Sequence, residues 1–228
     1  MRKPTISTPD QDRRRPGPEP RFSREELAQR ALAILDAHGP DGLTMRALAA
    51  ELGMGTMALY RYFPSKRELI DAAVEIAAPQ IELPDPGAGD WKQQLGSLAH
   101  ELFDAGLRHP SLARERFSRP LTSPAALRAT DAAIALLLQA GLSNSDAVAA
   151  FKALLLFTLA AAASAASEAT AEVRKHASSR HAAVPAAELP AMASVADELT
   201  AALGGDQAFE LGLTALLDGI ELRTPYSS

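Results

Sequence analysis

Basic side chains gather in one short stretch of an otherwise acidic chain. The segment 44–67 contains Arg46, Arg61, Lys66 and Arg67 against Glu51 alone, so its local charge is +3. Guanidinium and ammonium groups bind phosphate oxygens, and arginine also pairs with the O6 and N7 atoms of guanine. These residue types therefore favour contact with a nucleic acid.

The net charge of −5 does not exclude this chemistry, because the charge is unevenly distributed. Residues 1–78 have a net charge of +1 and residues 79–228 one of −6. A DNA surface needs only local positive charge. The 228 residues, 47% of them hydrophobic, are ample for a buried core in one or two domains.

Patterns for catalysis or metal binding are weak. The pairs His100–Glu101 and His176–His181 are spaced by one and five residues, which does not align side chains on a helix face. The chain has no cysteine, and no nucleophile-elbow, zinc-protease, phosphate-loop or dinucleotide motif. We therefore predict no enzyme activity, no metal and no cofactor. No uninterrupted run of 18 apolar residues predicts a signal or a membrane span, so a cytoplasmic protein without a membrane partner is expected.

Two short helices around a glycine turn must position the basic groups. Thr44 opens an apolar stripe through Met45, Leu48 and Leu52, and Gly53 ends it, as expected of a residue that enters the left-handed region cheaply. A second pattern runs to Phe63, where proline at the next position stops the helix. This arrangement predicts a helix-turn-helix.

A helix on either side supports the motif. Ser23 and Glu26 have the spacing of a capping box, which predicts a helix from there to about Gly39. Ser65 is the expected N-cap of another helix, from about Lys66 to residue 78.

The same stretch resembles the TetR (tetracycline repressor) family of transcriptional regulators. The matching residues are Gly42-Leu43-Thr44, Arg46-x-Leu48-Ala49, Leu52-Gly53, Leu59-Tyr60, and Tyr62-Phe63-x-x-Lys66 followed by Leu69. The close resemblance covers about residues 24–78. The ending Phe209-Glu210-x-Gly212-Leu213-x-x-Leu216-Leu217-Asp218-Gly219 is similar to the C-terminal dimerisation helix of the subgroup that contains the tetracycline repressor.

The resemblance implies which residues meet DNA. Thr56, Met57, Ala58 and Arg61 would face the major groove, with Arg46 reaching in from the preceding helix. Arg46 and Arg61 are the expected base readers, and phosphate contacts would come from Thr44, Tyr60, Tyr62 and Lys66. For Tyr60 and Tyr62 core packing is the alternative. The chain departs from the family pattern at Gly55, Ala58 and Arg61, which leaves the operator sequence open.

The segments on either side of residues 22–78 differ in composition from the helices. Residues 1–21 contain five prolines and the run Arg13-Arg14-Arg15, which predicts a disordered basic arm that is either a minor-groove or phosphate contact or a solvated tail. Pro84, Pro86 and two glycines interrupt the stretch 79–90. We therefore expect a DNA-binding domain over 22–78 and a second domain over 79–228.

The second domain is predicted to be all-α. Helices are expected from about Asp90 to Arg108, from Ser123-Pro124 to Gly141, from Ser143 or Asn144 to about Ala169, and from Asp206 to about Leu222. Residues 170–187 are expected to form a loop, and a weaker helix follows Pro190. In the first of these helices Leu107 is expected to face inward, and the helix at about 145–169 is apolar almost all round, which predicts burial on more than one face.

Such a helical domain offers sites between its helices. The candidate lining residues for a mainly hydrophobic small molecule are Leu102, Phe103, Phe117, Leu138, Phe151 and Leu155, with His100, His109 and Arg116 as polar anchors; ordinary core or surface positions are the alternative for each. Surplus apolar surface predicts a homodimer through Leu154, Phe157, Phe209, Leu213, Leu216, Leu217 and Ile220.

The resemblance and the residues together predict a ligand-responsive, homodimeric regulator that binds a palindromic double-stranded DNA operator, with repression as the expected sign. The alternative is an all-α binding module or enzyme with a vestigial helix-turn-helix. That alternative needs a cluster of polar catalytic groups in residues 79–228, which the sequence does not show, and it does not need Arg46, Tyr60 and Lys66.

Overall fold

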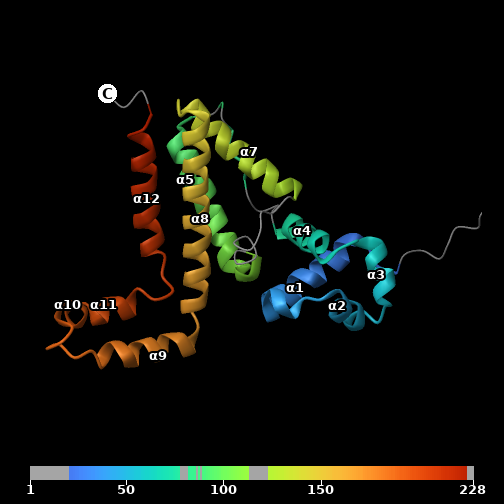
Figure 1. Ribbon diagram of the computed structural model, residues 1–228, viewed down its shortest axis with the longest axis horizontal. Coiled ribbons are helices and arrows are strands. Elements are labelled where there is room, and N and C mark those ends of the chain that lie inside the picture. Colours follow the sequence, from blue (N-terminus) through green and yellow to red (C-terminus); the bar gives the residue numbers. More distant parts are fainter. Residues whose placement is uncertain (1–20, 78–81, 86, 88, 113–122, 225–228) are drawn as a thin grey trace, which may run out of the picture.

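The computed structural model describes residues 21–77, 82–85, 87, 89–112 and 123–224. The basic arm, apart from Arg21, lies outside the described residues, as do parts of the stretch 79–90. The elements within the described ranges are all helices, which confirms the all-α prediction. The helices formed by residues 24–77 lie at one end of the molecule, and those formed by residues 91–108 and 124–221 lie at the other (Figure 1).

The N-terminal helices are α1 (Arg24–Gly42), α2 (Met45–Glu51), α3 (Thr56–Tyr62) and α4 (Lys66–Ala77). The start of α1 follows the predicted cap, because Ser23 forms the capping box with Glu26. Thr44, predicted to open the next helix, caps α2: its side chain accepts the amide hydrogen of Ala47. Gly53 has a φ of 59°, so the turn uses the conformation that favours glycine. Helix α1 is longer than expected, because it bends at Gly39 (φ 72°) and adds a last turn.

One hydrophobic core holds these four helices together. Leu27, Leu35, Leu48, Leu59 and Leu69 are fully buried in it, and α1 packs along α4 while α3 packs against α2. Burying side chains of this size stabilises the domain by about 1.5–3 kcal/mol each relative to exposure.

The C-terminal bundle consists of α5 (Trp91–Arg108), α7 (Pro124–Gln139), α8 (Asn144–Glu168) and α12 (Gln207–Glu221). Helix α8 is central, because α5, α7 and α12 all pack against it. Phe209 fills the space between them, and its ring stacks on Phe103 with centroids 4.0 Å apart. The buried stripe of α5 passes through Gly106, so Leu107, which was expected inward, is 39% exposed.

A close approach explains one glycine of α12. A Cβ atom on Gly212 would lie 2.2 Å from Cζ of Phe157, so any side chain there would have to displace the ring. Gly212 therefore lets α8 and α12 approach each other.

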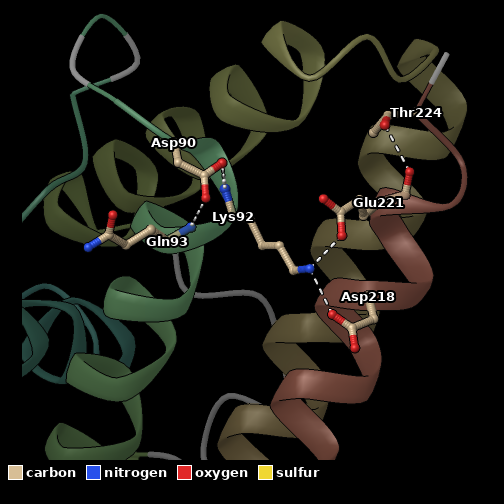
Figure 2. A network of polar contacts seen from close by, with 6 residues as sticks. All are labelled: Asp90, Lys92, Gln93, Asp218, Glu221 and Thr224. Carbon is tan, nitrogen blue, oxygen red and sulfur yellow. Dashed lines mark hydrogen bonds and ion pairs between the residues drawn. The ribbon is translucent and has the colours of Figure 1, made fainter. Parts of the chain in front are cut away.

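A polar tie joins the start of α5 to the end of α12 (Figure 2). The ammonium group of Lys92 lies 2.7 Å from Oδ1 of Asp218 and 2.5 Å from Oε2 of Glu221. Hydrogen bonds to Asp218 and then Glu221 raise the pKa of Lys92 above its usual range. The tie links the C-terminal end of α12 to the start of α5 at the surface of the bundle.

The prediction of a loop over 170–187 is wrong. The chain forms α9 (Ala171–Ala182), followed by α10 (Pro190–Ser194) and α11 (Ala196–Ala201), and these helices project from the ends of α8 and α12 (Figure 1). Helix α9 is capped by Thr170 but has no buried residue. A helix that is polar on every side gives no apolar period, so the sequence pattern could not reveal it.

Candidate DNA-binding surface and effector region

The helix-turn-helix presents the predicted base readers to the outside. Leu59 and Phe63 are fully buried and hold α3 on the core, whereas Met57 is 78% exposed. Arg46 on α2 and Arg61 on α3 are also exposed. Helix α3 therefore has one anchored face and one free face, the arrangement that a helix needs to enter the major groove.

The other residues predicted to meet DNA flank that face. Thr56 and Ala58 are half-buried, and Tyr60 is 41% exposed. Tyr62 is half-buried and packs on the core, and Thr44 is exposed although its hydroxyl caps α2.

Lys66 has a partner within the domain. Its Nζ donates to the carbonyl oxygen of Pro40 at 2.6 Å, which ties the start of α4 to the last turn of α1. An ammonium group has three donors, so this bond leaves two for a phosphate.

Sequence reasoning missed Arg24. Its guanidinium donates a hydrogen bond to the carbonyl oxygen of Tyr62 at the C-terminal end of α3, and lies 4.2 Å from the centroid of the Phe63 ring. The available signal was a basic residue in the first turn of a helix, where the helix dipole disfavours positive charge.

The predicted effector residues are only partly brought together. Phe103 is buried, and Leu102 and Phe151 pack against the same core from α5 and α8. Leu155 is half-buried and Leu138 is 41% exposed. Arg116 and Phe117 lie outside the described residues.

His100 links α5 to α12. Its Nε2 lies 2.8 Å from Oε1 of Glu210, its Nδ1 contacts the carbonyl oxygen of Gly96, and its ring meets Phe209 edge-on. Burial acts to lower the pKa of His100, but the Gly96 carbonyl, Glu210 and Asp104 together outweigh it, so the pKa is raised above 6.5. The imidazole is thus held by a carboxylate in a half-exposed position.

His109 lies at the junction between the two ends of the molecule. Its Nδ1 is 2.9 Å from Oδ2 of Asp36 on α1, and the buried hydroxyl of Ser111 donates to the carbonyl of Leu35. On the other side of the junction, Glu75 of α4 accepts from the amide of Ala125 at the start of α7. These three contacts connect α1 and α4 to the segment that follows α5 and to the start of α7.

Two grooves among the described residues lie elsewhere. One, of about 820 Å³, lies between α1, α4 and the start of α7, and another, of about 560 Å³, lies along α5 at Glu101, Asp104, Leu107 and Arg108. Neither is lined by a residue that was predicted to bind the effector.

The residues predicted for the dimer interface are mostly covered by their own chain. Leu154, Phe209, Leu213, Leu217 and Ile220 are buried in the bundle core, and Phe157 and Leu216 are half-buried. Other apolar side chains on the same helices are exposed instead: Val148 and Leu156 on α8, Leu211 within α12, and Leu222 at its C-terminal end.

Helix α8 is also long and apolar enough to cross a membrane, judged by length and composition alone. A core helix of a water-soluble bundle passes the same test, and α8 packs against three neighbours. Only 28% of its apolar window is buried, so much of its apolar surface is open to a further partner.

Comparisons with known proteins agree with this architecture. Residues 27–73 match the model for bacterial regulatory proteins of the tetR family, and residues 83–224 match the tetracyclin repressor-like C-terminal domain. The repressor DrrR1 of Streptomyces coeruleorubidus is 35% identical over 92% of this chain and 82% of its own length, and the class C tetracycline repressor of Escherichia coli is 34% identical over 88% and 91%. The structure of Streptomyces coelicolor ActR in complex with actinorhodin has a TM-score of 0.78 and 28% identity, covering 91% of this chain and 99% of that one.

A helix-turn-helix ahead of a helical domain of this kind defines a ligand-responsive DNA-binding regulator. The chain belongs to the TetR family, as its sequence predicted. Its relatives are transcriptional regulators, and the family is not one of enzymes.

Proposed function

We propose that the protein is a homodimeric repressor that leaves a palindromic operator when a mainly hydrophobic small molecule binds its C-terminal domain, residues 79–228. The observation that carries the proposal is the outward face of α3, with Met57 and Arg61 exposed above a fully buried Leu59. DrrR1 and the tetracycline repressors are named as repressors, which supports the same sign of control here. Its place of action is the cytoplasm, where the DNA is.

The apolar character of the bundle supports a hydrophobic effector. Phe103, Phe151 and Phe209 lie among aliphatic side chains, and a buried charge without a partner there would be costly. ActR, which shares this fold, binds actinorhodin. The effector is therefore not a phosphorylated or multiply charged metabolite.

A second copy of the chain fits the exposed apolar residues of α8 and α12. These two helices pack side by side, so Leu156 and Leu211 belong to neighbouring elements. Two such helix pairs form a four-helix bundle across a two-fold axis. The two DNA-binding domains, residues 22–78 of each copy, then bind two half-sites.

Selection of bound duplexes from a random DNA pool by the wild-type protein tests the proposal. A repressor of this kind enriches an inverted repeat, and compounds that raise the melting temperature in a thermal-shift screen release that duplex at matching concentrations. Failure to enrich any sequence would support the vestigial helix-turn-helix instead. If only polyanions or metal ions release the DNA, the hydrophobic-effector proposal is wrong.

A further inference from the structure

The recognition helix is weakly fixed by its own sequence. Helix α3 has seven residues, and Gly55 at its N-cap offers no side-chain hydrogen bond. Helices this short are not stable alone, and each end leaves backbone groups without helical partners. Contacts from other elements must therefore set its orientation.

Arg24 supplies such a contact at the C-terminal end of α3. Its guanidinium donates to the carbonyl of Tyr62, which is one of the unpaired carbonyls of the last turn, and it lies over the buried ring of Phe63. A cation is favoured at the negative end of a helix dipole, and charged donors make stronger hydrogen bonds than neutral ones. The ring face adds a cation–π attraction.

The position of Arg24 in α1 is locally unfavourable. It is the first residue after Ser23, where the capping box and the acidic Glu25 and Glu26 suit the positive end of the dipole and a cation does not. A local conflict of this kind indicates that a contact elsewhere compensates for it. The contact with Tyr62 and Phe63 is that compensation.

We infer that Arg24 is a positioning residue for DNA recognition, which fixes the end of α3 against α1 without touching DNA itself. Helix α1 packs mainly along α4 and α3 mainly against α2, so this side chain is a direct link from α1 to the recognition helix. Its loss lets the C-terminal end of α3 tilt, and Arg61, one residue before Tyr62, moves with it. Base contacts depend on placement to about 0.5 Å, whereas phosphate contacts tolerate small shifts.

The test compares Arg24→Ala with Arg30→Ala, which removes the same charge from an exposed position of α1 that has no hydrogen bond or ion pair among the described residues. The probes are the duplex that the wild-type protein selects from a random pool and a scrambled duplex of equal length, each titrated over a salt series. Arg24→Ala is expected to weaken binding of the selected duplex about tenfold. Binding of the scrambled duplex and the salt slope should match those of Arg30→Ala.

Two results would overturn the inference. If both duplexes lose affinity in parallel and the salt slope falls by about one unit relative to Arg30→Ala, then Arg24 contacts a phosphate. If selected-duplex affinity stays at the wild-type level, α3 does not depend on Arg24.

Thermal melting separates positioning from general destabilisation. Should Arg24→Ala be unfolded at the assay temperature, Arg24→Met replaces it, because methionine keeps an unbranched side chain but has neither the charge nor a hydrogen-bond donor. Weaker binding of the selected duplex, with unchanged binding of the scrambled duplex, supports positioning. Unchanged binding of both duplexes contradicts it. Amide NMR signals of Met57 and Ala58 in the DNA-free protein should shift in the Arg24 variant and not in Arg30→Ala.

Discussion

The two ends of the molecule use apolar surface differently. In the DNA-binding end, large apolar side chains are in the core, and among the described residues of α1–α4 the well-exposed ones are Met57 and Tyr60 on the recognition helix. In the bundle, the core is equally closed, yet Val148, Leu156 and Leu211 are exposed along α8 and α12. Exposed apolar residues thus coincide with the surface that we propose for DNA at one end. At the other, those on α8 and α12 mark the surface that we propose for a second copy, whereas Leu107, Leu127 and Leu138 are exposed on α5 and α7 outside it.

The largest expected effect comes from charging that second surface. Leu211→Glu places a carboxylate on a residue that is 75% exposed in one chain, so the monomer should fold normally while the homodimer fails. Because two half-sites are bound together, operator affinity should fall by about 100-fold or more. Sedimentation and DNA titration measure the two effects.

Leu83→Glu is the matched control for that variant, since Leu83 is 45% exposed and lies between α4 and α5 in the sequence, outside α8 and α12. It should sediment and bind DNA as the wild type does. A dimeric Leu211→Glu protein would show that the copies associate through another face.

A substitution among the predicted base readers should change the DNA specificity of the protein more than its stability. Arg46→Ala removes an exposed side chain that makes no hydrogen bond or ion pair within the described residues, so the melting temperature should hardly change. Loss of a bidentate contact with guanine costs about 1–3 kcal/mol and relaxes selection at one base pair. Repeating the random-pool selection with the variant shows whether one base pair of the selected DNA sequence loses its base preference. An unchanged selected sequence would remove Arg46 from the base readers.

An effect of similar size, on stability in place of specificity, should follow from filling the close approach between α8 and α12. Gly212→Ala forces the Phe157 ring aside, which should destabilise the bundle by about 1–3 kcal/mol. Gly219→Ala is the control, because a Cβ there meets nothing within 4 Å. Denaturant unfolding of both is best compared in the Leu211→Glu background, where no second copy covers α12.

The difference between the two ends also shows how far sequence reasoning reaches. The caps at Ser23 and Ser65, the start of a helix at Thr44 and the turn at Gly53 are local features, and each was predicted correctly. The surplus apolar surface of α8 and α12 was also visible in the sequence, but which side of each helix their own chain covers depends on packing. Leu211 and Leu213 are two residues apart, yet Leu213 is buried and Leu211 is exposed.

The same difference between local features and long-range packing holds for the site residues. The face of α3 could be predicted because family resemblance fixes it residue by residue. The roles of His109 and Arg24 could not, because their partners Asp36 and Tyr62 are distant in sequence. Helix α9 was not predicted because it has no buried residue, so its sequence has no apolar period.

The smallest expected effect is a pH dependence confined to the bundle. His100 has a raised pKa in the folded protein, so the pairing with Glu210 stabilises the fold below the ordinary value of 6.5 and is lost as the pH rises through the folded value. The melting temperature of the wild type should therefore fall slightly between about pH 6 and pH 8, and that part of the fall should be absent in His100→Gln. Both partners are about half exposed, so about 1 M salt should reduce the difference. His176→Gln, on the exposed face of α9, is the control and should keep the wild-type pH profile; if His100→Gln keeps it as well, the contact with Glu210 contributes nothing to the attachment of α12.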